Sequence, residues 1–236
     1  MPNLGLAQVF VEMRGDRSVV AQQLGQAPLQ VHAPLYLDGA KHPTVFLKSP
    51  SSGLLHGDEH RVSIKISDGA TLEVRTQAST LVYPGTSRQT ISIELNENSS
   101  LIFHPHALIL ARGANLMQDI NVSLKRTSHL SYSEHWSAGR IAMNEAWQFE
   151  QFTNTVNIYI EQALVYREHW KLRPADSDVT NSLIAGGFLH FKNAYLHGDY
   201  TNRAPRAVAR PNEQRLWTLN RDTLQIDRTA AVRTIS

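Results

Sequence analysis

The sequence predicts a mainly β protein built from stacked strands, on the basis of two observations. Apolar and polar residues alternate with a period of two along most of the chain, as in RVSIKIS at 61–67. Turn residues such as Asp68-Gly69 separate these alternating stretches at short intervals. Alternation implies strands with one buried and one wet face, and the frequent turns suit a sandwich, a barrel or stacked antiparallel or mixed sheets.

The chain has 236 residues, of which 42% are hydrophobic, and this is enough for one sizeable core. We therefore expect a single domain over residues 1–236. Within it, residues 1–171 hold the main sheets, and residues 172–236 form a C-terminal segment. The stretch LRPADSDVTN at 172–181 is rich in Pro and Asp and is the expected hinge between these two parts.

Charge and cysteine content exclude several classes of function. Lys and Arg number 23 against 21 Asp and Glu, without a basic run, so no nucleic-acid partner is expected. The chain has no cysteine, so any metal ligand must be a His nitrogen or a carboxylate oxygen. The N-terminus lacks a secretory pattern, and no apolar run approaches the ~20 residues of a membrane helix. These features predict a soluble cytoplasmic protein without a membrane partner.

The individual elements follow from the same alternation. The stretches 61–67 and 71–77 flank Asp68-Gly69 and predict a β-hairpin. Pro105 interrupts the apolar run 101–110, which predicts a strand, a corner and a second strand. Further strands are expected at 89–95, 120–126, 128–136 and, as two strands or one bent pair, 153–170. A short helix is expected in PNEQRLWTLNRDTLQ at 211–225, and no internal repeat is evident by inspection.

Two groups of histidines raise the possibility of a metal site. His104 and His106 share a strand face at i and i+2, and His56, Asp58 and His60 follow the same spacing. A cupin-like metalloenzyme using His56, His60, His104 and His106 is therefore one alternative. Against it, Gly57 favours a turn that scatters the second group, with the Asp58 carboxylate accepting hydrogen bonds from nearby backbone N–H groups.

Other polar residues allow structural or functional interpretations. Arg140 follows Gly139, and its guanidinium can form a bidentate bond with Glu134 or Glu145 that pins two strands. Gln77, Thr80 and Tyr83 either line a polar interior or are ordinary hydrogen-bonded strand residues. No activated nucleophile is recognisable, so these residues by themselves define no enzyme.

The order of several short motifs resembles the UreD family of urease accessory proteins, called UreH in some bacteria. The motifs are SSGLLHGD at 51–58, TQASTLVY at 76–83, LIFHPHALIL at 101–110, ARGA at 111–114 and YSEHWSAGRIAMNEAWQF at 132–149. The resemblance covers about residues 44–170. The chain departs from the family pattern at Ser52, where the family has Gly, at Leu81, where it has Lys, and at the 101–105 corner, which lacks the family's acid.

The resemblance implies a non-enzymatic scaffold with a stacked, β-helix-like arrangement of sheets. Family members bind apo-urease and the accessory protein UreF, which recruits the nickel-carrying GTPase UreG. Within that complex, both a monomer and a dimer of this chain are compatible with the resemblance. No tightly bound cofactor is implied, only nickel(II) in transit through an internal polar channel. An unrelated β-rich binding module remains a further alternative.

The resemblance also assigns residues to these roles. The channel positions are Asp58, Thr80, Glu134 and Glu168, with transient metal contact expected at Asp58 and Glu134. The residues of the structural motifs are Gly57, Gln77, Tyr83, Gly139, Arg140 and Glu145.

Overall fold

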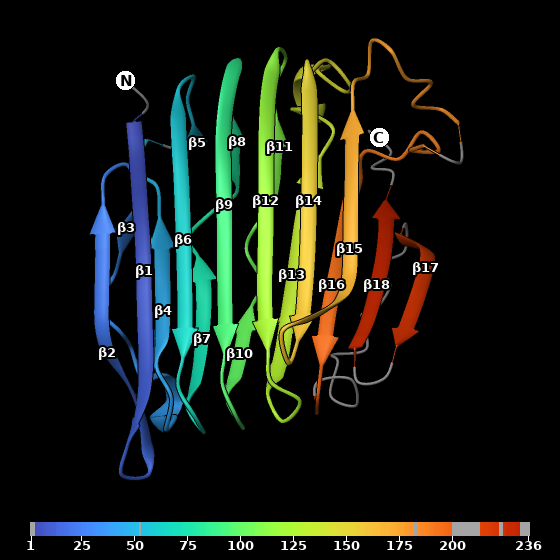
Figure 1. The fold of residues 1–236 in the computed structure, drawn as a ribbon. Coiled ribbons are helices and arrows are strands. Elements are labelled where there is room, and N and C mark those ends of the chain that lie inside the picture. Colours follow the sequence, from blue (N-terminus) through green and yellow to red (C-terminus); the bar gives the residue numbers. More distant parts are fainter. Residues whose placement is uncertain (1–2, 52, 182–183, 200–212, 222–223, 232–236) are drawn as a thin grey trace.

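The computed structural model describes residues 3–51, 53–181, 184–199, 213–221 and 224–231, which form two facing β-sheets (Figure 1). The first sheet has seven strands in the order β15 (Ala163–Leu172), β14 (Gln151–Ile160), β12 (Ala114–Leu124), β9 (Gly85–Leu95), β6 (Asp58–Ile66), β1 (Asn3–Arg14) and β2 (Arg17–Gln26). The second sheet has eleven, eight of them in the order β17 (Glu213–Arg221), β18 (Leu224–Ala231), β16 (His190–His197), β13 (His129–Ser137), β10 (Ser100–Phe103), β7 (Thr71–Thr76), β4 (Thr44–Lys48) and β3 (Gln30–Val31). The short strands β5 (Gly53–Leu54), β8 (Thr80–Val82) and β11 (Leu108–Leu110) complete it, and single 3-10 turns cover Leu37–Gly39 and Ile141–Met143.

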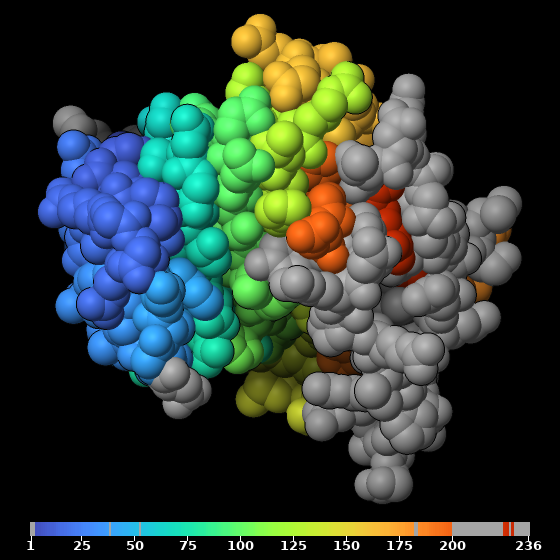
Figure 2. Space-filling model, turned by 90° about the horizontal axis from the view of Figure 1, so that it is seen from below, coloured from blue at the N-terminus to red at the C-terminus, as the bar shows by residue number. Residues whose placement is uncertain are grey.

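The chain coils from one sheet to the other and back, and successive coils stack by parallel pairing. In the first sheet, Val62 of β6 is paired with Ile91 of β9, and Ile91 with Ile120 of β12, so partners in these three strands lie 29 residues apart. Viewed nearly along the strands, Figure 2 shows the coils following one another in chain order from blue to green. This is the β-helix-like arrangement of stacked sheets that the family resemblance implies.

The predicted hairpin at Asp68-Gly69 is wrong. Strands β6 and β7 belong to different sheets, and Gly69, with φ of +70°, turns the chain from one sheet into the other. A hairpin and a corner share the same alternation and the same turn residues, so the local pattern could not separate them. The 29-residue repeat of the coils is not evident in the sequence, because it preserves side-chain polarity and turn position but not residue identity.

The predicted C-terminal helix is also wrong. Glu213–Arg221 and Leu224–Ala231 form an antiparallel strand pair that continues the second sheet beyond β16. Strand β16 is itself paired with β13, so the segment 172–236 contributes strands to the same sheet as the main body. Pairing along an existing sheet edge outweighs a weak local helix preference. Part of the predicted helix, at 211–212 and 222–223, lies outside the described residues.

Other predicted elements are confirmed. The apolar run around Pro105 divides into β10 and β11, and the stretch 153–170 lies within the hairpin of β14 and β15. Glu161 and Gln162 make that hairpin turn with φ of +48° and +66°. In the described part of the chain, no helix has the length and apolar character needed to cross a membrane.

The space between the sheets holds two apolar clusters. The larger includes Val62, Ile91 and Ile120 and runs along most of the coils. The smaller gathers aromatic rings around Trp136, which stacks on Phe191 of β16 with ring centroids 4.1 Å apart. A layer of polar side chains lies between these two clusters, and it forms the candidate site.

Candidate functional site

A row of four polar side chains crosses the inner face of the first sheet, one from each successive coil. The paired residues are His60 of β6, Gln89 of β9, Gln118 of β12 and Asn154 of β14. Gln118 Nε2 donates to Gln89 Oε1 over 3.2 Å, and His60, Gln118 and Asn154 are 3% exposed or less. With adjacent strands ~4.8 Å apart, this row, which we call the polar row, is roughly 14 Å long.

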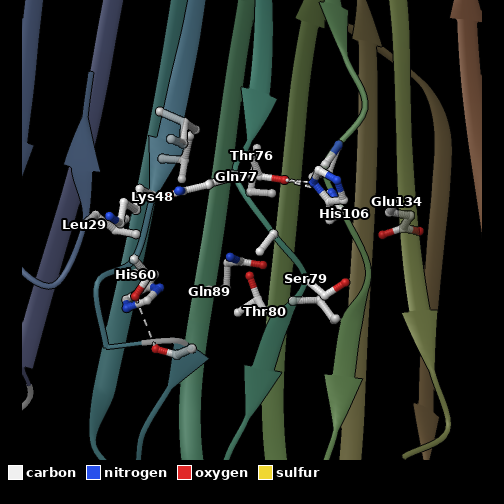
Figure 3. A pocket seen from close by; sticks show the side chains of 18 of the residues that line it. Leu29, Lys48, His60, Thr76, Gln77, Ser79, Thr80, Gln89, His106 and Glu134 are labelled. Carbon is white, nitrogen blue, oxygen red and sulfur yellow. Dashed lines mark hydrogen bonds between the residues drawn. The ribbon is translucent and has the colours of Figure 1, made fainter. Parts of the chain in front are cut away.

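Three residues of the polar row, His60, Gln89 and Gln118, line a chamber of about 290 Å³ between the sheets. The fourth, Asn154, contacts the chamber residue Glu134. Opposite the polar row, the second sheet is interrupted where three links join β4 to β5, β7 to β8 and β10 to β11. Residues of these links line the chamber, including Gln77, Ser79 and His106. Figure 3 shows His60 and Glu134 at opposite sides of the chamber, with Gln89 and Thr80 between them. The break in the second sheet therefore provides the space that the polar row faces.

His60 forms the end of the polar row nearest β1. Its partner in β1 is Gly5, where an added Cβ would lie 3.2 Å from His60 Cδ2 and 2.9 Å from Pro28 Cδ. Burial lowers the pKa of His60, and the nearby Asp58 carboxylate opposes that shift. Nε2 of His60 is buried and has no hydrogen-bond partner among the described residues. The imidazole is therefore neutral at pH 7 and keeps an unused ring nitrogen.

Glu134 of β13 lies at the other end and is 4% exposed. Its Oε1 accepts hydrogen bonds from Asn193 Nδ2 at 2.6 Å and Tyr195 OH at 2.9 Å. Asn154 Nδ2 lies 3.2 Å from both carboxylate oxygens, which joins Glu134 to the polar row. Burial raises the pKa of Glu134, these donors oppose the rise, and the Glu168 carboxylate adds to it. The site thus holds a carboxyl group whose charge is only partly compensated.

Glu168 of β15 belongs to the same cluster, at its outer side. Arg228 of β18 donates through NH2 to Glu168 Oε1 and through Nε to Asn193 Oδ1, the latter at 2.7 Å. A continuous series of hydrogen bonds therefore runs from Glu134 through Asn193 and Arg228 to Glu168.

Asp58 holds the turn that precedes β6. Its Oδ2 accepts from the backbone N–H of Leu55 at 2.8 Å, and its Oδ1 accepts from Asn3 Nδ2 at 3.1 Å. Gly57 adopts φ of +84°, in the left-handed region where glycine is favoured. Asp58 is two residues before His60 on the same inner face, so it extends the polar layer to the first residue of β6.

The four predicted channel residues thus take different places. Thr80 and Glu134 line the chamber, Glu168 is linked to Glu134 through hydrogen bonds, and Asp58 lies beside the end of the polar row. Of the predicted motif residues, Gln77 also lines the chamber. The backbone N–H of Tyr83 donates to Leu54 O at 2.9 Å, which ties two neighbouring coils.

Arg140 makes its ion pair with Glu145, one of its two predicted partners, and not with Glu134. Nε and NH2 of Arg140 donate to the two carboxylate oxygens at 2.7 and 2.6 Å. Gly139 makes this loop possible, because a Cβ there would lie 2.1 Å from the backbone oxygen of Glu145. The pair fixes the connection between β13 and β14, away from the chamber.

The histidines do not converge as the metalloenzyme alternative requires. His56 Nδ1 accepts from the backbone of Thr86, His106 Nδ1 is bonded to Thr76, and both ring nitrogens of His104 are bonded to serines. Across the described ranges, no three His, Asp or Glu side chains come together as a metal-binding group.

Several residues of the site carry no motif in the sequence. They are Gln89, Gln118, Asn154, Asn193 and Arg228. For Gln89 and Gln118, the signal is the 29-residue offset that places them in one row with His60. Without the coil register, each is one polar residue at an inward position of an alternating strand.

Fold and site together define a class: a β-helical protein with a polar interior and no assembled metal-ligand cluster among its described residues. The sequence model of the family described as "UreD urease accessory protein" matches residues 4–234. The chain therefore belongs to the UreD family of urease accessory proteins.

Individual relatives agree with this membership. Urease accessory protein UreD of Synechococcus sp. (strain JA-2-3B'a(2-13)) is 34% identical over 208 residues, 84% of this chain and 76% of the relative. Urease accessory protein UreD 2 of Synechococcus sp. (strain JA-3-3Ab) is 32% identical over 83% of this chain and 75% of the relative. Urease accessory protein UreH of Helicobacter pylori (strain HPAG1) is 29% identical over 76% and 69%, respectively.

Proposed function

We propose that this protein is a non-enzymatic scaffold that binds apo-urease and UreF, through which UreG joins, and that nickel(II) passes through its chamber. The observation that carries the proposal is the polar row, which links His60 to Glu134 between two apolar clusters. Burying such a layer costs folding free energy, so its presence across four coils supports a role other than stability. The cytoplasm is the compartment that this role requires.

The chemistry of the row suits a divalent ion in transit. Nickel(II) accepts imidazole, carbonyl and carboxylate ligands. The row offers one imidazole and three amide carbonyls at intervals of one strand spacing, and the Glu134 carboxylate is bonded to its Asn154 end. A conducting path must bind an ion weakly at several places so that it can leave again. His60, Gln89 and Glu134 are separate weak sites and not a closed cage, which agrees with release to a downstream acceptor.

The direct test replaces Gln118 by Leu, which keeps the side-chain volume and removes the polar group from the middle of the row. We expect Gln118→Leu to co-purify with UreF and apo-urease while urease from the same cells contains less nickel and is less active. Gln8→Leu is the matched control, because Gln8 is exposed on β1 of the same sheet. An intact complex with unchanged urease nickel would remove the polar row from the nickel route.

A second variant separates the two roles of Asp58. Asp58→Asn can still accept from the backbone N–H of Leu55 but carries no charge. If Asp58 serves the ion, Asp58→Asn lowers urease nickel content without changing thermal stability, whereas Asp58→Ala lowers both. Full urease activation by Asp58→Asn would leave Asp58 with the turn-holding role alone.

A further inference from the structure

At the outer end of the site, the Arg228 guanidinium places a positive charge beside the Glu168 carboxylate. Glu134 and Glu168 interact electrostatically inside the protein, and the Arg228 guanidinium bridges Glu168 to Asn193. Their side chains are largely enclosed, since Glu168 is 14% and Arg228 is 22% exposed. The guanidinium therefore supplies the counter-charge that two neighbouring carboxylates need.

Two unused acceptor atoms lie in the same cluster. Oε2 of Glu168 and Oδ1 of Asn154 are buried without a hydrogen-bond partner among the described residues. Asn154 is fully buried, and its amide nitrogen already contacts Glu134. The cluster therefore has more oxygen acceptors than Arg228 and the other donors satisfy, as expected of a place that can hold a further cation.

We infer that Glu134, Asn154 and Glu168 form a divalent-cation site that is closed in this structure by the Arg228 guanidinium. Arg228 and the cation compete for the same carboxylate, so the site opens when the guanidinium leaves Glu168. Arg228 lies on β18, next to the last strand of the second sheet, and a partner that displaces this strand would open the site. The inference deepens the proposed nickel passage and rests on it for its biological meaning.

The chemistry of the exchange is simple. Nickel(II) loses water ligands to carboxylate and amide oxygens, while the guanidinium moves to solvent and keeps its positive charge, as arginine side chains do in proteins. No covalent bond forms, and the net gain of positive charge at the site is one. An uncharged side chain at position 228 removes the competitor, whereas lysine keeps its charge.

The test is nickel(II) binding to the isolated full-length chain by titration calorimetry, without urease or other partners. We expect Arg228→Gln to bind at least about tenfold more tightly than the wild type, because an opposing charge is gone, and Arg228→Lys to bind as weakly as the wild type. Arg228→Gln combined with Glu168→Gln should lose the gain. Arg75→Gln is the matched control, because Arg75 is ion-paired with Glu73 on the exposed face of β7. Equal affinity of Arg228→Gln and the wild type would overturn the inference.

A second measurement does not depend on the folding of Arg228→Gln. In the wild-type chain, the Arg228 Nε–H signal, assigned by its loss in Arg228→Lys, should broaden and exchange faster with water as zinc(II) is added, because the bond to Asn193 opens. An unchanged Arg228 signal while the Glu134 carboxyl carbon shifts would also overturn the inference. Because neither experiment involves urease, normal metal binding together with normal urease activation by Gln118→Leu would reject the nickel passage and leave the cation site standing.

Discussion

Two neighbouring rows of inward-facing side chains lie on the same strands of the first sheet but have different roles. One row consists of Val62, Ile91, Ile120 and Val156, and the other, two residues earlier on each strand, is the polar row of His60, Gln89, Gln118 and Asn154. The first row belongs to the main apolar cluster, whereas three residues of the second, His60, Gln89 and Gln118, line the chamber. An inward position therefore indicates burial, and only its neighbours across the coils indicate whether that burial stabilises the fold or forms a site.

The largest expected effect comes from the apolar row. Ile120 is fully buried in the middle coil, so Ile120→Ala should lower the free energy of unfolding by about 2–5 kcal/mol, through lost burial and a cavity. Urea denaturation followed by tryptophan fluorescence measures this loss. Ser123→Ala, on the exposed face of the same strand, should stay within about 0.5 kcal/mol of the wild type. If both variants were equally stable, the apolar row would not be the stabilising one.

A smaller effect is expected where the two rows begin on β1. Gly5 is paired with His60 of the polar row, and Ala7 with Val62 of the apolar row. A methyl group at Gly5 would meet His60 and Pro28, so Gly5→Ala should cost about 1–3 kcal/mol by overpacking. In the apolar row the methyl group has the opposite effect on stability. Removing it by Ala7→Gly should destabilise the protein by about 1 kcal/mol. Thermal denaturation of both variants tests this reversal, and a neutral Gly5→Ala would show that His60 is loosely held.

The smallest expected effect is a dependence on pH that the apolar row cannot show. Since the pKa of Glu134 is raised above its ordinary 4.5, the folded state holds this proton more tightly than the unfolded chain does. That contribution to stability is fully present below pH 4.5 and is lost as the pH rises through the raised pKa. Glu134→Gln lacks the titration, so its stability relative to the wild type should improve between about pH 5 and about pH 8. Urea denaturation at the two pH values measures the difference, and a constant difference would place the Glu134 pKa at its ordinary value.

Local chemistry predicted many features of this protein. Alternation identified most strands and their buried faces, Pro105 marked the break between β10 and β11, and Gly57 with Asp58 marked the turn before β6. These features depend on residues within a few positions of one another. The wrong hairpin at Asp68-Gly69 shows the limit, because turn chemistry does not specify which sheet the next strand enters.

The site itself required the tertiary structure. Sequence alone determined that the chain alternates, turns often and resembles the UreD family, and it pointed to Glu134 and Glu168 through that resemblance. Only the parallel stacking of coils placed Gln89 and Gln118 beside His60, and only the last strand pair brought Arg228 to Glu168. The physical reason is that parallel pairing joins residues 29 or more positions apart, so the polar row is a property of the register between coils and not of any single strand.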